Sequence, residues 1–374
     1  MLELAIILPT LNERGNLAPL IERIEQALGP AIGDAGWEVL IVDDDSKDGT
    51  ADEARAIALA DTRVRVIQRI GRRGLASAAI EGVCATAAPF VAVMDADHQH
   101  DPELLPQMLA TLKADEADIC VASRFADGAS IEGWAEPERE KLSGMANAIA
   151  RRLTGVELTD PMSGYFMLST AIARALVPRL SGIGFKVLLD LLASAPKSVG
   201  APMKLEEFPL NFAARREGTS KLDRAVAFDF LVGLYDKTLG RVIPTRFALF
   251  GTVGALGVIV HMAVLASLLF VFEQSFTRPF SAAQGIAVLS AMSFNFWLNN
   301  WLTYRDKRLT GWGAVLRGWA GFCLTCAVGG FANVAVATLI EGRGVHWVLA
   351  ALCGILIGSV WNFALSSRFV WGRY

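Results

Sequence analysis

The sequence predicts an α/β domain with a mostly parallel sheet, followed by an interfacial helix and an all-α membrane domain with four spans. Residues 1–223 alternate short apolar runs with amphipathic stretches, which is typical of a parallel α/β sheet. Residues 245–374 instead contain four long apolar segments. Hydrophobic residues make up 53% of the 374-residue chain, and the mean hydropathy of +0.40 is high for a soluble protein.

Five apolar runs predict the strands of the sheet: Leu4–Leu8, Val39–Val42, Val64–Ile67, Phe90–Met94 and Ile119–Val121. Stretches between them, such as Leu17–Leu28 and Asp101–Leu112, have helical spacing. Ligands of such sheets bind beyond the carboxyl ends of the strands. The polar segments that follow these runs are therefore the candidate site.

Two aspartates follow the fourth predicted strand, in Asp95-Ala96-Asp97. Residues two apart on an extended strand point to the same side, so both carboxylates can converge on one point. Gln99 follows Asp97 by two residues, so the same alternation places its side-chain oxygen on the same side, as a third ligand. Such hard oxygen ligands suit Mg²⁺ or Mn²⁺, with the phosphates of a nucleotide completing the shell. The alternative is an acidic turn that binds no metal.

Polar loops also follow the first two strands, at Pro9–Glu13 and Asp43–Thr50. Acidic side chains there can accept hydrogen bonds from a base or a ribose. Turn and N-cap chemistry is the alternative, and it accounts for Ser46, Asp48 and Gly49.

The four apolar segments are Phe247–Phe272, Ser281–Thr303, Val315–Ile340 and Trp347–Phe369. Each is long enough to cross a bilayer core, which takes about 20 helical residues. Basic residues gather on one side of the predicted spans: Lys237, Arg241, Arg246, Arg305, Lys307, Arg308, Arg317, Arg368 and Arg373. The opposite loops hold only Arg278 and Arg343. The positive-inside rule therefore places both termini and the α/β domain in the cytoplasm.

Two further segments are candidates for the membrane surface. Pro137–Thr154 combines an apolar stripe with basic residues at helical spacing, although packing on the core of its own domain is equally compatible. Arg224–Gly240 leads into the first span, and we assign residues 224–244 to an interfacial helix and linker.

Composition excludes several other classes of protein. The net charge of −3 gives no case for nucleic-acid binding. The five cysteines show no disulfide framework. Cys323-x-x-Cys326 lies in an apolar segment without a second pair, so we interpret it as helix packing.

The ordered motifs resemble those of family 2 glycosyltransferases, which have the Rossmann-like GT-A fold. The resemblance rests on Pro9–Glu13, Asp43–Thr50 and Asp95–Asp97. It narrows to the dolichol-phosphate mannose synthases through Ser123-Arg124-Phe125, Arg139 with Ser143, and Arg215-x-x-Gly218-x-Ser220-Lys221. The tail resembles GtrA-like membrane domains through Asn295–Asn300 and Trp361–Phe363, and that match is looser.

The resemblance implies a role for each matched residue on the donor side. Pro9, Glu13 and Asp43 would hold the nucleoside, and Asp45 would lie near the ribose, where the family often has Asn. Asp95, Asp97 and Gln99 would bind the metal. Arg215 and Lys221 would grip the donor diphosphate.

The resemblance assigns the acceptor phosphate to Arg124, Arg139 and Ser143. A guanidinium offers bidentate recognition of phosphate, and on a helix residues four apart share one face. Asp160, in a loop that also matches the family, would orient an arginine, touch the sugar or cap a turn.

The implied reaction is inverting transfer of mannose from GDP-mannose to dolichyl or polyprenyl phosphate. UDP-glucose is the alternative donor, because related enzymes share these motifs. A processive polysaccharide synthase would carry Gln-x-x-Arg-Trp, which the chain lacks. A membrane domain that flips a lipid-linked sugar is a further alternative, although helix–helix hydrogen bonding explains its Asn, Ser and Thr residues equally well.

Overall fold

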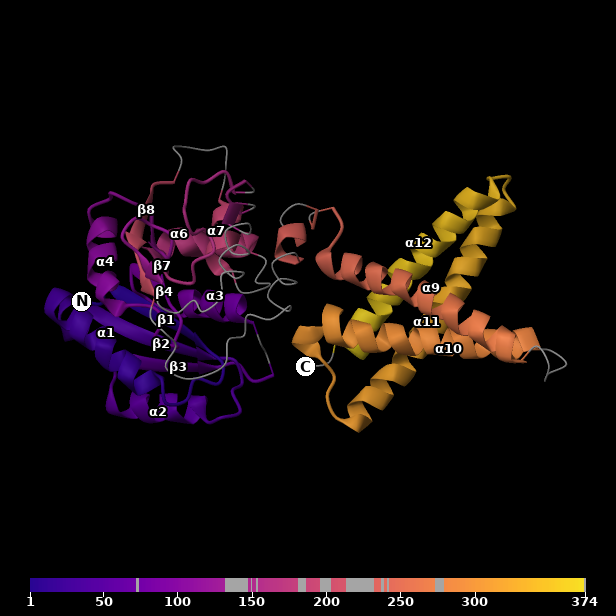
Figure 1. The fold of residues 1–374 in the computed structure, drawn as a ribbon, viewed down its shortest axis with the longest axis horizontal. Helices are drawn as coiled ribbons and strands as arrows, with labels where there is room; N and C mark the ends of the chain where they lie inside the picture. Colours follow the sequence, from indigo (N-terminus) through magenta and orange to yellow (C-terminus); the bar gives the residue numbers. More distant parts are fainter. Residues whose placement is uncertain are drawn as a thin grey trace. The chain divides into compact units, whose positions relative to one another are not determined.

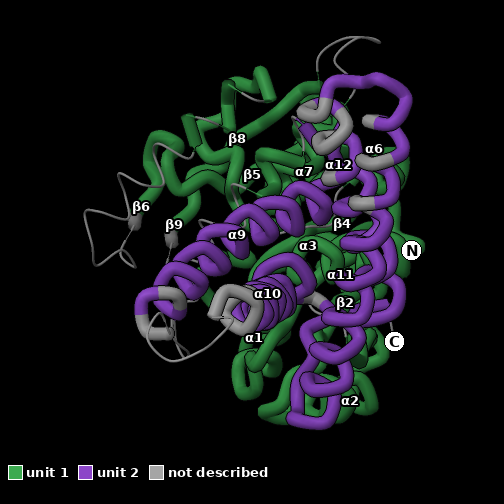
Figure 2. Tube along the Cα trace, turned by 90° about the vertical axis from the view of Figure 1, so that its right-hand side faces the viewer, with its two compact units in different colours: residues 1–237 green, residues 238–374 purple. Residues whose placement is uncertain are grey.

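The computed structural model describes residues 1–71, 74–131, 147–148, 150–152, 154–180, 186–195, 203–212, 232–236, 239–240, 242–272 and 279–372. The chain divides into two compact units, residues 1–237 and 238–374 (Figure 2). Most of Pro137–Thr154 and of Arg224–Gly240, the two segments expected at the membrane surface, lies outside the described residues.

A seven-stranded sheet forms the centre of the first unit (Figure 1). Its strands are β1 (Leu4–Thr10), β2 (Trp37–Asp43), β3 (Val64–Gln68), β4 (Phe90–Val93), β5 (Ile119–Ser123), β7 (Phe166–Ser169) and β8 (Leu205–Pro209). Their spatial order is β3-β2-β1-β4-β7-β5-β8. Neighbouring strands are parallel except for β7, which runs antiparallel to β4 and β5. The predicted mostly parallel sheet is therefore confirmed.

Helices cover both faces of this sheet, because alternate strand residues point to opposite sides. In β1, Leu4, Ile6 and Leu8 pack into one core cluster, whereas Ala5 and Ile7 pack into the other. The first cluster includes residues of α1 (Leu17–Ile32), α2 (Thr50–Ala60) and α4 (Leu105–Lys113). The second includes residues of α3 (Leu75–Ala85), α6 (Thr170–Leu176) and α7 (Val187–Ser194).

β7 and β8 were not among the strands predicted from the sequence. β7 has only four residues and follows a loop that contains Pro161 and Gly164, so it lacks the strand–helix alternation that marked the other strands. A separate pair of two-residue strands, β6 (Ser130–Ile131) and β9 (Asn211–Phe212), was missed for the same reason of length.

The topology brings several loops to one edge of the sheet. The chain builds β1, β2 and β3 on one side and then returns to β4 on the other side of β1, so the strand order reverses between β1 and β4. Because β7 is antiparallel, its first residue, Phe166, pairs with Val93 and Val121 near the carboxyl ends of β4 and β5. The loop that enters β7 therefore lies at the edge where ligands of open α/β sheets bind.

Four long helices form most of the second unit: α9 (Thr245–Phe272), α10 (Pro279–Leu298), α11 (Trp312–Glu341) and α12 (Trp347–Leu365). They coincide with the four predicted apolar segments. α10 and α12 each continue into a five-residue π-helical turn, at Asn299–Thr303 and Ser366–Val370. Within the described residues, Thr245–Leu268 and Trp312–Ala332 are long and apolar enough to cross a membrane.

The two helix pairs of this unit pack in the same way, with an asparagine of one helix against a glycine of the other. In the α9–α10 pair, Asn295 lies against Gly257, and in the α11–α12 pair Asn362 lies against Gly329. A Cβ atom at either glycine would overlap the asparagine side chain. Both asparagine Oδ1 atoms are buried without a conventional hydrogen-bond partner in the described part of the chain. Cα–H···O contacts are the interactions that such close glycine approaches permit at helix interfaces.

We predict that Gly257→Val or Gly329→Val lowers the thermal stability of the detergent-solubilised protein, because the new side chain must displace the asparagine. Overpacking of this kind typically costs about 1–3 kcal/mol. Gly254→Val and Gly330→Val are matched controls, since nothing lies within 4 Å of a Cβ at either position. Equal unfolding midpoints for all four variants would contradict the packing described here.

Candidate active site

The loop after β1 is hydrogen-bonded to the loop after β2. The amide of Asn12 donates to Ser46 Oγ at 2.9 Å, and the amide of Lys47 donates back to Asn12 Oδ1 at 3.1 Å. The amide of Glu13 donates to Thr50 Oγ1 at 3.0 Å. The predicted nucleoside-binding loops are therefore fixed side by side at the carboxyl edge.

The predicted nucleoside residues occupy different environments in these loops. Pro9 is buried within β1, and Glu13 accepts a hydrogen bond from Asn16 Nδ2 at 2.9 Å. Asp43 ends β2 without solvent exposure and accepts from the amide of Ser46 at 3.0 Å. Asp43 thus holds its own turn, as N-cap and turn chemistry predicts.

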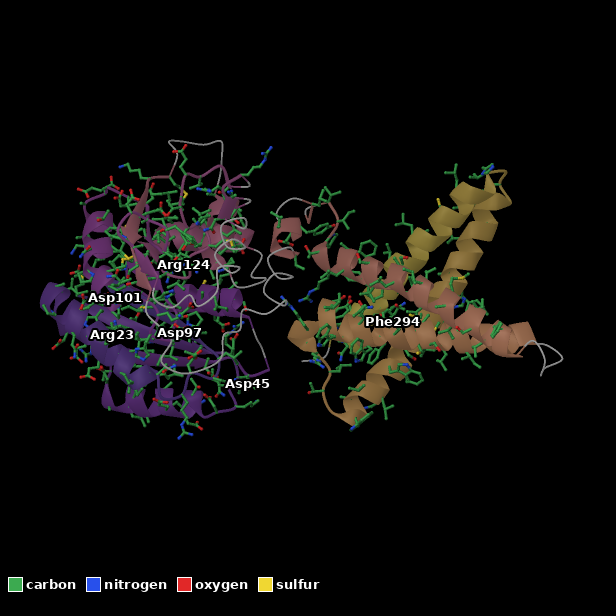
Figure 3. The ribbon with its side chains drawn as sticks, in the orientation of Figure 1. Arg23, Asp45, Asp97, Asp101, Arg124 and Phe294 are labelled. Carbon is green, nitrogen blue, oxygen red and sulfur yellow. The ribbon has the colours of Figure 1, made fainter. Side chains whose placement is uncertain are left out.

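Asp45 differs from Asp43 in its exposure to solvent. Its backbone is left-handed, with φ of +55°, and its Oδ2 lies 2.9 Å from Lys47 Nζ in a surface ion pair. Figure 3 labels Asp45, Asp97 and Arg124, which lie on the loops after β2, β4 and β5. The sheet therefore gathers these three predicted site residues at one edge.

A buried ion pair beside the β2 loop was missed by the sequence analysis. Asp44 and Arg69 are 5% and 3% exposed, and Arg69 Nη1 donates to Asp44 Oδ1. The amide of Gly74 donates to the other Asp44 oxygen at 2.6 Å. Burial raises the pKa of Asp44, and these hydrogen bonds oppose that rise. Within a run of three aspartates, sequence alone does not show which one turns inward.

The Asp95–Asp97 segment departs from the predicted extended geometry. β4 ends at Val93, and the chain bends from Ala96 to His98, where φ is +65°. The alternation of an extended strand was therefore the wrong basis for aligning the two carboxylates. Oδ1 of Asp97 instead accepts from the amide of Gln99 at 3.2 Å. Asp97 is 5% exposed, whereas the side chain of Asp95 is 39% exposed.

Two buried histidines, His98 and His100, stabilise this loop through contacts with other parts of the domain. Nδ1 of His100 accepts from the amide of Asp95 at 2.9 Å, and its ring stacks on Tyr165. A neutral His100 must therefore carry its proton on Nε2, which lies 3.8 Å from Asp95 Oδ2. Nε2 of His98 lies 3.0 Å from the carbonyl oxygen of Asn16 at the start of α1. Both histidines hold the shape of the acidic loop.

Arg124 is held by a bidentate ion pair with Asp160. Nε of Arg124 donates to Oδ2 of Asp160 at 2.7 Å, and Nη2 donates to Oδ1 at 2.9 Å. The Asp160 side chain is fully buried, and the Arg124 side chain is 14% exposed. Two parallel hydrogen bonds fix the plane of a guanidinium. The structure therefore confirms that Asp160 orients an arginine.

The loop from Asp160 to Tyr165 links this ion pair to the acidic loop. The Ser163 hydroxyl donates to the carbonyl oxygen of Ala122 in β5 at 2.7 Å. A Cβ atom at Gly164 would lie only 3.2 Å from Asp95 Oδ2, so the backbone of this loop runs directly beside that carboxylate. One loop therefore contacts the surroundings of both Arg124 and Asp95.

Lys186, a partly buried residue that the sequence analysis missed, lies against the same loop. It immediately precedes α7, and its Nζ donates to the carbonyl oxygen of Met162 at 3.0 Å. Burial lowers the pKa of Lys186 to about 8, and the charge of Arg124 contributes, while Asp160 and Asp95 oppose the shift. In the sequence Lys186 is an isolated cation before an apolar helix, and only the topology brings it to the site.

Four predicted phosphate-binding residues, Arg139, Ser143, Arg215 and Lys221, lie outside the described residues. Their roles remain predictions from the resemblance.

The acidic loop fits a metal that is shared with a substrate. No group of three or more His, Cys, Asp or Glu side chains suited to a metal occurs in the described part of the chain. Mg²⁺ commonly takes only one or two protein carboxylates, and phosphate and water oxygens complete its shell. Asp95, with its exposed carboxylate, Asp97 and Gln99 form a donor set of that type.

Two family models match consecutive parts of the chain. Residues 5–177 match the model "Glycosyl transferase family 2". Residues 249–371 match "GtrA/DPMS, transmembrane domain", so the protein is a membrane protein. The first match includes β1 to β7 and the loops between them but ends before β8, and the second includes nearly all of the four long helices.

One relative matches the chain over both units. The chain is 30% identical over 377 residues to a dolichol-phosphate mannosyltransferase of Pyrococcus furiosus, covering 99% of each protein. It is 35% identical over 231 residues to that of Saccharomyces cerevisiae, covering 62% of this chain and 85% of the yeast protein.

A solved structure of glucosyl-3-phosphoglycerate synthase from Mycobacterium tuberculosis, with Mn²⁺, UDP and phosphoglyceric acid, matches at 20% identity and a TM-score of 0.46. The match extends over 63% of this chain and 78% of that one. That last similarity is too low to bear on the reaction. The length and identity of the first match show that the chain belongs to the dolichol-phosphate mannosyltransferases, a membrane-associated group of family 2 glycosyltransferases.

Proposed function

We propose that the protein transfers mannose from GDP-mannose to the phosphate of a polyprenyl or dolichyl lipid, with inversion at the anomeric carbon. The observation that carries this proposal is the pairing, at one edge of the sheet, of an acidic loop with an arginine fixed by a buried carboxylate. One centre suits a metal and a nucleotide diphosphate, and the other suits a second phosphate. The similarity to the Pyrococcus furiosus enzyme along its whole length supports the choice of mannose and of a dolichol-type acceptor.

On the donor side, Glu13 and Asp45 would contact the nucleoside, and the buried Pro9 and Asp43 would fix the loops around it. Asp95, Asp97 and Gln99 would hold Mg²⁺ or Mn²⁺. When bound, such a metal would neutralise the charge that develops on the leaving diphosphate. Arg215 and Lys221 would add positive charge there. Preorganised charge of this kind stabilises a transition state without reorganising during the reaction.

On the acceptor side, Arg124, Arg139 and Ser143 would bind the lipid phosphate. A phosphate oxygen is already ionised near neutral pH, so it needs positioning more than a general base. This oxygen would form the new bond to the anomeric carbon while the bond to the nucleotide diphosphate breaks. Attack from the opposite face gives a β-linked product from an α-linked donor.

We also propose that α9, α10, α11 and α12 all span the membrane, with residues 1–223 on the cytoplasmic side. The excess of Lys and Arg on one side of the helices supports this orientation. The polar motifs of these helices are used in packing, at Asn295 and Asn362, and this supports an anchoring role over a translocation path.

The donor assignment predicts the product of a direct assay. Purified full-length protein, supplied with Mg²⁺ and polyprenyl phosphate, should transfer label into the organic phase at least about tenfold faster from GDP-mannose than from UDP-glucose, a difference of about 1.4 kcal/mol. Faster transfer from UDP-glucose would instead support a glucosyltransferase. Label that crosses the bilayer without entering a new lipid would support a flippase.

The metal assignment predicts that Asp97→Asn lowers turnover by on the order of a hundredfold, the scale typical for losing one charge-stabilising group in an active site. Thorough treatment with EDTA should have the same effect on the wild type, and Mg²⁺ or Mn²⁺ should restore it. Asp115→Asn is the control, because Asp115 is exposed and Asn tolerates its left-handed backbone. Full turnover in EDTA would contradict the proposal.

The topology predicts opposite labelling of two loops. In a cysteine-free background, Thr310→Cys should react with an impermeant thiol reagent from the cytoplasmic side, and Thr277→Cys from the other side. Thr310 follows the basic residues Arg305, Lys307 and Arg308. Labelling of both positions from the same side would rule out the four-span arrangement.

A further inference from the structure

Lys186 has no role in the reaction proposed above, although it lies within the same cluster. Its Nζ is fixed by the carbonyl oxygen of Met162, two residues after the Asp160 that orients Arg124. The amide of Ser163 donates to the carbonyl oxygen of Asp160 at 3.1 Å, which closes the turn that contains Met162. The positions of the lysine and arginine cations are therefore set by one turn.

Within the described residues, the ammonium group of Lys186 makes one hydrogen bond. An ammonium has three N–H donors. In the described part of the chain, the carbonyl of Met162 is the acceptor that Nζ contacts within hydrogen-bond distance. Lys186 is only partly buried, and an anion that contacts a partly buried cation replaces water at its remaining donors. The carbonyl of Met162 does not neutralise the charge of Lys186, so the ammonium remains able to bind an anion.

The charges around Lys186 favour an anionic ligand. Arg124 and Lys186 are positive, and the buried Asp160, which pairs with Arg124, is negative, so this group carries one excess positive charge. The negative charge of Asp95 also acts on Lys186. However, the Asp95 carboxylate belongs to the proposed metal centre, where a divalent cation would neutralise its charge. The excess charge lies beside Arg124, on the acceptor side of the site.

We propose that Lys186 binds the phosphate of the lipid acceptor together with Arg124. This inference rests on the proposed function. A lysine is a compact point charge without the planar geometry of a guanidinium, so it can contact a phosphate oxygen from a second direction while Arg124 provides the fixed face. Two cations held by one turn would then fix both the position and the rotation of the attacking phosphate.

The packing of the neighbouring helix makes this position rigid. Val187, Leu188, Leu191 and Leu192 of α7 are buried in the core cluster on one face of the sheet. Lys186 directly precedes these residues, so its backbone cannot shift without disturbing the core. A preorganised cation of this kind gains more in phosphate binding than a flexible surface lysine, because it loses less entropy when the ligand arrives.

The test compares the wild type with Lys186→Met in the full-length protein, using GDP-mannose and a short-chain polyprenyl phosphate in detergent. Methionine keeps the apolar stem and removes the charge. We expect the KM for the lipid phosphate to rise roughly ten- to a hundredfold, the loss expected for one charge-assisted hydrogen bond. The KM for GDP-mannose should change by less than about threefold, and Lys186→Arg should recover part of the lipid affinity.

Lys204→Met is the matched control, because Lys204 Nζ also donates to a backbone carbonyl, that of Asp115 at 2.8 Å, but the residue is exposed. Isothermal titration with the lipid phosphate alone provides a readout that does not depend on turnover, and it distinguishes lost binding from lost folding when the thermal stability is measured alongside.

The outcomes separate the two proposals. A wild type without mannolipid product would refute the proposed function itself. With an active wild type, an unchanged KM for the lipid in a folded Lys186→Met protein would refute the role of Lys186. A rise confined to the KM for GDP-mannose would also refute it, and would place the lysine against the donor sugar.

Discussion

The bidentate ion pair between Arg124 and Asp160 is the interaction on which the rest of the site depends. A fully buried carboxylate is stable only when it is paired and hydrogen-bonded, so the arginine must stay in place whether or not a substrate is present. The loop that carries Asp160 then continues past Met162, whose carbonyl accepts from Lys186, to Gly164, whose backbone runs beside Asp95. One short segment thereby sets the distance between the acidic and the basic parts of the site.

This arrangement suits a reaction between two phosphate-bearing substrates. Two phosphates repel each other, so a transferase must hold each with separate positive charge and still bring one oxygen to the carbon attached to the other. The loop after β4 carries the carboxylates suited to a metal, whereas the end of β5 carries the fixed guanidinium. The antiparallel strand β7 lies between β4 and β5, and its entry loop lies beside Asp95 and carries the partner of Arg124.

Much of the sheet could be predicted from the sequence, because strands buried on both faces appear as continuous apolar runs such as Leu4–Leu8. The order in which the strands pair could not be predicted from the sequence, because nothing in the four residues of β7 indicates that they lie between two parallel strands. For the site, the order of the motifs predicted which loops meet at the carboxyl edge of the sheet and predicted Arg124 as a phosphate-binding residue. It did not predict the bend after Val93, which depends on His98 and His100 contacting residues far away in the sequence. Lys186 was missed for the same reason, since its partner is a backbone carbonyl of another loop.

The most direct test of this account is an experimental structure of the full-length protein with Mn²⁺, GDP and a short-chain polyprenyl phosphate. The account predicts an anomalous manganese signal at the carboxylates of Asp95 and Asp97, at roughly 2.2 Å, typical of such oxygen ligands. It also predicts the lipid phosphate within hydrogen-bond distance of Arg124, on the other side of the loop from Asp160 to Tyr165. A metal bound away from Asp95 and Asp97, or a lipid phosphate that does not reach Arg124, would contradict the two-centre site.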